Sequence, residues 1–148
     1  MARATVLLLL LVAACGGSAS PGAEPENVIA TLKQQGLPIG ESLAYTAETD
    51  RNNLLGRPGE YIAKIMFADI RLVPAGGDEF DVYNGGSIEF FASEDDARKR
   101  AATLTAATGN ISDLAETSYL DGKRLLRISK RLTPDQSKQY ETAFKSLK

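Results

Sequence analysis

The polar loop from Asp50 to Gly59 is the stretch whose side chains are best suited to bind a ligand. The candidate binding residues are Asp50, Asn52, Asn53 and Arg57. Their donors and acceptors stand among Gly and Pro residues that favour turns, and loops of this kind often present binding groups. An alternative, which the composition favours, is a structural loop in which Asn and Asp close turns and Leu54 and Leu55 enter the core.

The chain contains no histidine, which excludes the catalytic sites in which histidine takes a proton from Ser or Cys. The segment from Gly85 to Glu89 begins like the G-x-S-x-G nucleophile motif, but Glu89 replaces its last glycine. Two carboxylates could still hydrolyse a glycoside, yet with 19 acidic residues some pair is always available. We therefore predict that the protein is not an enzyme and keep an envelope hydrolase that uses carboxylates as an alternative.

Metal and cofactor motifs are weak in this sequence. Asp50, Asn52 and Asn53 resemble the start of a calcium loop, but Leu54 stands where that loop needs an oxygen ligand and Glu60 falls one residue short of its closing position. A single cysteine without histidine excludes a Cys/His zinc site. The glycine motifs that bind phosphates or dinucleotides are absent. We predict no metal and no cofactor.

The N-terminal segment has the features of an export signal followed by a tether. Arg3 precedes an apolar run from Val6 to Val12, which is too short to span a bilayer but suits a signal peptide. The next residues, Val12-Ala13-Ala14-Cys15, resemble the lipobox of bacterial lipoproteins, and this resemblance implies cleavage before Cys15 and a diacylglycerol on its sulfur. The predicted parts are a signal peptide (1–14), a lipidated Cys15 with a flexible tether (15–25) and one domain (26–148).

A lipid on Cys15 would place the domain at the extracytoplasmic face of the cell membrane. One acyl chain holds a protein weakly, whereas two or more give stable anchoring. Residues 16–25 are rich in Gly, Ser, Ala and Pro, a composition typical of a flexible linker. Two alternatives stay open: an ordinary signal peptide cut at the same place, which would leave a free thiol, and an uncleaved apolar N-terminus.

Charge is distributed unevenly along the chain. Residues 15–97 carry 5 basic and 14 acidic side chains, a net charge of −9, whereas residues 98–148 carry 11 basic and 5 acidic side chains, a net charge of +6. The basic half could bind anionic lipid or a cell-wall polymer. Internal pairing of the two halves is the preferred alternative. The partners we expect are the membrane, through the lipid anchor, and an envelope protein or cell-wall polymer, but no nucleic acid.

Apolar periodicity and turn residues predict an α+β domain. Helices are predicted over 26–35, 93–109 and 133–147, and strands over 42–46, 61–72, 87–92, 116–120 and 123–129. The order is therefore α-β-β-β-α-β-β-α. Hairpin connections, above all the one around Asp121-Gly122, imply a mostly antiparallel sheet. We predict two layers, with the helices packed on one face of the sheet.

Four segments carry a recognisable pattern. They are Tyr45-Thr46-Ala47-Glu48-Thr49-Asp50, Asn52-Asn53-Leu54-Leu55-Gly56-Arg57-Pro58-Gly59, Gly85-Gly86-Ser87-Ile88-Glu89, and Leu125 to Ser129 before Leu132-Thr133-Pro134. With these segments the chain resembles a group of small secreted actinobacterial lipoproteins of uncharacterised function, from about Val28 to Leu147. The resemblance implies export, lipidation and a single small domain, and it implies no catalytic residue.

Together these patterns predict a membrane-anchored, non-catalytic binding or accessory module of the cell envelope. The sequence does not name its ligand. Besides the carboxylate hydrolase, a structural or signalling partner of a membrane protein stays open as an alternative.

Overall fold

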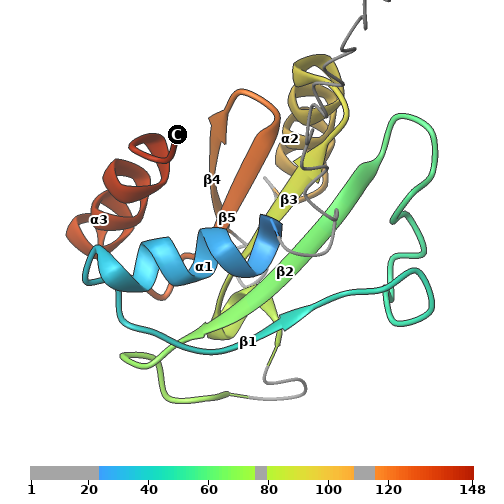
Figure 1. The fold of residues 1–148 in the computed structure, drawn as a ribbon. Helices are drawn as coiled ribbons and strands as arrows, with labels where there is room; N and C mark the ends of the chain where they lie inside the picture. The colour runs from blue at the N-terminus through green and yellow to red at the C-terminus, as the bar shows by residue number, and fades with distance from the viewer. Residues whose placement is uncertain (1–23, 76–79, 109–115) are drawn as a thin grey trace, which may run out of the picture.

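The computed structural model describes residues 24–75, 80–108 and 116–148, so the predicted signal peptide, Cys15 and most of the tether lie outside the described residues. The elements are α1 (Glu24–Gln34), β1 (Ile39–Ala44), β2 (Tyr61–Asp69), the short 3₁₀ helix η1 (Val82–Asn84), β3 (Gly85–Phe91), α2 (Glu94–Thr108), β4 (Glu116–Asp121), β5 (Arg124–Ser129) and α3 (Pro134–Lys145) (Figure 1). Helix α1 already includes Glu24 and Pro25, so the domain begins earlier than the predicted boundary at residue 26.

The five strands form one antiparallel sheet in the order β1-β2-β3-β5-β4. This confirms the predicted α+β class, the antiparallel sheet and the order of helices and strands. The hairpin between β4 and β5 pairs Asp121 with Arg124, so its turn begins at Gly122, one residue later than predicted. Gly122 has φ +57°, which suits the first central position of a tight hairpin turn.

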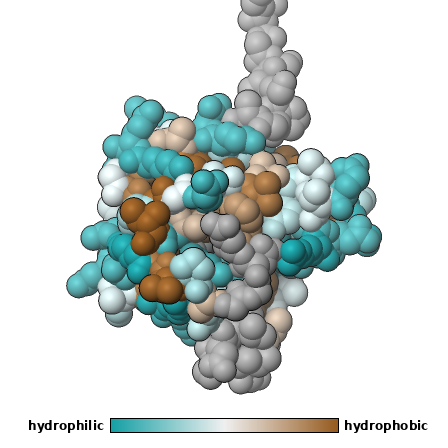
Figure 2. Space-filling view, turned by 90° about the horizontal axis from the view of Figure 1, so that it is seen from below, coloured by the Kyte–Doolittle hydropathy of each residue, from teal (hydrophilic) through white to brown (hydrophobic). Residues whose placement is uncertain are grey.

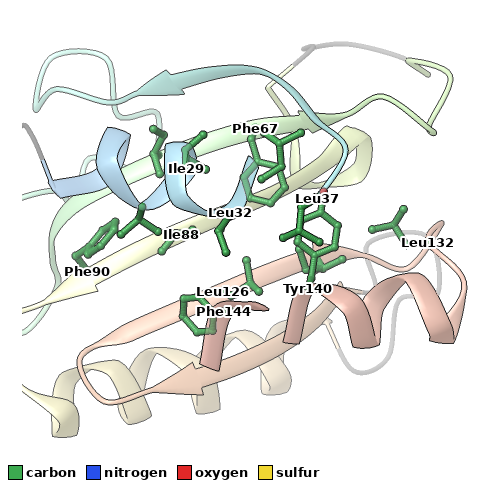
Figure 3. Packing of buried hydrophobic residues seen from close by; sticks show 14 residues of the cluster. Ile29, Leu32, Leu37, Phe67, Ile88, Phe90, Leu126, Leu132, Tyr140 and Phe144 are labelled. Atoms are coloured by element: carbon green, nitrogen blue, oxygen red, sulfur yellow. The ribbon is translucent and has the colours of Figure 1, made fainter. Parts of the chain in front are cut away.

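Helices α1 and α3 cover one face of the sheet, which we call the front face (Figures 1 and 3). Leu32 from α1, Ile88 from β3, and Tyr140 and Phe144 from α3 are fully buried there. The rings of Tyr140 and Phe67 stack with their centroids 5.6 Å apart. Each large apolar side chain buried in this way stabilises the fold by about 1.5–3 kcal/mol, so this cluster is the main core.

Helix α2 packs against the opposite face, which we call the back face (Figure 1). Here Ala97 and Leu104 of α2 meet Tyr61, Phe91 and Leu125 of the sheet. The prediction that all helices lie on one face was therefore wrong for α2. The physical reason is that β3 and β5 bear apolar residues on both faces, and each apolar face must be covered.

Local hydrogen bonds set the end of α1 and the start of α3. Gly36 adopts φ +87°, and the Leu37 N–H donates to the Leu32 carbonyl, which is a Schellman arrangement at the end of α1. Thr133 forms a capping box with Gln136 at the start of α3. These bonds depend on residues that are near one another in the sequence.

Candidate functional site

The predicted binding loop lies between β1 and β2, and the buried Asp50 side chain holds it against β2. Asp50 is only 4% exposed. Its Oδ2 accepts hydrogen bonds from the backbone N–H groups of Leu54 (2.9 Å) and Leu55 (3.1 Å) and from the Tyr61 hydroxyl (2.7 Å). Leu54 and Leu55 pack against the back-face core. For these residues the structural-loop alternative is correct, and Asp50 does not face solvent as a binding group would.

A buried ammonium group accompanies this carboxylate. Lys64 of β2 is 6% exposed, and its Nζ lies 3.5 Å from Asp50 Oδ1. The same Nζ lies 4.9 Å from the centre of the Tyr45 ring and 5.4 Å from that of Tyr61. Both rings present their faces to the cation, so Lys64, Asp50 and the two tyrosines form one buried polar unit under the loop.

The environment shifts the pKa of each of these groups. Burial alone would raise the pKa of Asp50, but the Tyr61 hydroxyl, the two backbone N–H groups and Lys64 outweigh it and leave that pKa lowered. Burial lowers the pKa of Lys64, although Glu89 and Asp50 oppose the change. Burial and the neighbouring Asp50 raise the pKa of Tyr61. The geometry thus favours an ionised Asp50 and a protonated Tyr61.

The other three predicted binding residues lie at the surface. Asn52, Asn53 and Arg57 are exposed. Asn53 adopts φ +52°, a conformation that Asn tolerates better than most residues because its side chain can bond locally. The Asn52 amide lies 3.4 Å from the Tyr61 hydroxyl, at the limit of a hydrogen bond. The structure therefore places one predicted residue beneath the loop and three on its outer side.

Sequence reasoning missed an ion network on the back face. Glu89 of β3 is fully buried and accepts from Arg100 of α2 (2.9 Å) and from Arg127 of β5 (2.8 Å). Arg127 also binds Glu116 of β4, at 2.8 and 2.7 Å. The network links α2 to three strands. Its signal in the sequence was the charged Glu89 within an otherwise apolar strand, since a buried charge requires a partner.

A second buried carboxylate lies at the far end of β2. Asp69 Oδ2 accepts from the Tyr140 hydroxyl (2.8 Å) and from Arg71 Nη2 (2.6 Å), and its Oδ1 accepts from the Arg71 backbone N–H (2.9 Å). The N–H groups and hydroxyl outweigh burial and hold the pKa of Asp69 below its usual value. This contact joins α3 to the sheet, so Asp69 stabilises the fold.

An open, shallow groove runs between the C-terminal end of α1 and α3. Gln35, Asp135, Lys138, Gln139 and Thr142 are among the residues that line it. Asp135 is the one acid among the described residues that line this groove, so those residues do not supply the two carboxylates that a glycosidase needs. Its amide and hydroxyl groups can form hydrogen bonds with a polar ligand.

Within the described ranges, no cluster of three or more acidic residues has the arrangement of a metal site. None of the helices in those same ranges is long and apolar enough to cross a bilayer. The predictions about metal, cofactor and anchoring therefore stay predictions.

Comparisons with protein-family models, curated proteins and solved structures found no match to this chain.

Proposed function

We propose that this protein is a non-catalytic binding or accessory module of the bacterial cell envelope, anchored by lipid on Cys15 at the extracytoplasmic face of the membrane. Support for the anchor comes from the apolar run and the Val12-Ala13-Ala14-Cys15 motif. Cys15 stands nine positions before Glu24, where α1 begins, so an acylated sulfur would keep the domain within about 30 Å of the lipid surface.

The binding proposal rests on the difference in burial among the polar residues of the Asp50 to Gly59 loop. Buried Asp50 holds the loop to the sheet, while Asn52, Asn53 and Arg57 stay exposed on its outer side. A loop fixed in this way loses little conformational freedom when it binds, so its polar groups are preorganised for a partner. We assign the ligand-binding role to these three exposed residues and not to Asp50.

Photo-crosslinking in intact cells tests this assignment. A photoreactive residue replaces Arg57 in the full-length protein, and a matched control carries it at Lys99, which is exposed on α2. We expect a discrete crosslinked partner from position 57 and none from position 99. Adding Asn52→Ala and Asn53→Ala should reduce the yield of that product. Equal crosslinking from both positions, or a yield unaffected by the two alanines, would contradict the assignment.

A further inference from the structure

The most exposed large apolar side chains of the described residues lie three positions apart, just after β2. Ile70 is 71% exposed and Val73 is 78% exposed, whereas Leu43, Ile62 and Tyr83 are between 41% and 49% exposed. We call Ile70 and Val73 the apolar tip. Figure 2 views the molecule from the end at which the connection between β2 and η1 lies, and there apolar side chains form separate brown areas among hydrophilic ones.

The chain around the apolar tip is held in place, so these side chains do not turn inward. Arg131 Nη2 donates to the Val73 carbonyl oxygen at 2.8 Å. The Asp69 carboxylate binds both the backbone and the side chain of Arg71. Leu72, between the two exposed residues, packs against the front-face core. These contacts fix the backbone of the tip while two aliphatic side chains stay in solvent, at a cost in hydration free energy.

Charge next to the tip is mixed. The Arg131 guanidinium lies 4.6 Å from the centre of the Tyr83 ring and donates to carbonyl and amide oxygens. Asp81, which is exposed in the same connection, supplies an acidic group. A surface of this composition does not favour attachment by charge alone. It suits a partner that accepts aliphatic side chains beside polar groups, as the boundary between lipid headgroups and acyl chains does.

The proposed anchor brings such a boundary within reach, and this inference rests on that anchor. Eight residues separate Cys15 from Glu24, and this stretch of chain extends at most about 30 Å. A compact domain of this length has a diameter of about 35 Å, so only the region directly opposite Glu24 lies beyond the reach of this tether. Tethering also gives a weak contact a high effective concentration. We propose that Ile70 and Val73 insert into the outer boundary of the lipid layer and orient the domain on the membrane.

The single cysteine of the chain allows a direct test. If the Cys15 sulfur carries lipid, Val73→Cys provides the only free thiol for a fluorescent probe in the full-length mature protein. Ile62→Cys, at the opposite end of β2, is the matched control. Each labelled protein is placed in vesicles of phosphatidylglycerol and phosphatidylcholine that contain brominated lipid, which quenches buried probes. We expect at least about twofold stronger quenching at position 73, decreased by Ile70→Ser in the same chain.

The outcomes separate the two proposals. Weak or equal quenching at both positions, in protein that remains on the vesicles, overturns insertion of the tip and leaves the anchor intact. Protein that leaves the vesicles and takes a second label at Cys15 overturns both. Crosslinking of position 73 to an envelope protein, without quenching by lipid, also overturns insertion and assigns the tip to a protein partner.

Discussion

Asp50 and Asp69 are buried carboxylates that hold the chain at opposite ends of β2. Each accepts from a tyrosine hydroxyl and lies beside a basic side chain, and Asp50 accepts from two backbone N–H groups and Asp69 from one. Removing one partner of a buried ion pair costs more than the pair contributes, because the other charge is then left in a poor solvent. Replacing the carboxylate of Asp50 should therefore destabilise the loop before β2. Replacing that of Asp69 should destabilise the contact between the sheet and α3.

The first prediction concerns Asp50. Asp50→Ala leaves Lys64 and two backbone N–H groups without their acceptor, and we expect the free energy of unfolding to fall by about 2–4 kcal/mol. Asn52→Ala, two residues away and exposed, should change it by less than about 0.5 kcal/mol. Denaturant unfolding measures both. Equal effects of the two substitutions would show that Asp50 does not fasten the loop.

The second prediction is acid sensitivity. The pKa values of Asp50 and Asp69 are lowered in the folded protein, so the unfolded chain, with Asp near 3.9, binds more protons in acid. The stability they contribute is present above about pH 4 and is lost as pH falls through the folded pKa values. Unfolding free energies measured from about pH 6 to 2.5 should decrease toward acid, less steeply in Asp50→Asn and Asp69→Asn. Slopes parallel to the unmodified protein would contradict this.

Among the strands and helices, β3 is the central strand that contributes side chains to both cores. It pairs with β2 on one side and with β5 on the other, and every one of its residues is buried. Ile88 and Phe90 enter the front-face core, while Phe91 enters the back-face core and Glu89 joins α2 to the sheet. A strand that contributes to both cores leaves little room for larger side chains.

The third prediction tests this crowding at Gly86. A Cβ there would lie 2.6 Å from the Arg127 carbonyl oxygen and 2.6 Å from the Phe67 ring. We expect Gly86→Ala to destabilise the protein by more than about 2 kcal/mol because neighbouring strands must shift. Gly36→Ala meets no atom within 4 Å but has φ +87°, so it should cost only about 1 kcal/mol. Thermal unfolding compares the two, and a reversed order would refute close packing at Gly86.

For the molecule as a whole, a lipid on Cys15 would hold the domain close to the membrane. The exposed residues of the Asp50 to Gly59 loop and the apolar tip both lie at the surface of the domain. With a short tether, these surfaces could bind only partners that lie near the membrane in the cell envelope.

The fourth prediction concerns this tether. Cys15→Ser removes the sulfur that would carry the lipid, so the protein should move from the membrane fraction to the soluble fraction while its unfolding midpoint stays unchanged. Fractionation with intact-mass measurement checks both the location and the lipid. An unmodified Cys15 in the original protein, or an unchanged distribution of the variant, would contradict the anchor.

Periodicity and turn residues predict the class of the fold and the order of its elements, and they place the end of α1 and the start of α3 to within one residue. They succeed because these features depend on residues near one another in the chain. The placement of α2 and the burial of Asp50 were decided only by tertiary structure. Whether an acid in a loop faces solvent depends on Tyr61 and Lys64, which reach it only when β2 joins the sheet, and such contacts leave no local pattern. All four residues belonged to the predicted site. Only the packing of the folded chain showed that Asn52, Asn53 and Arg57 are exposed while Asp50 is buried.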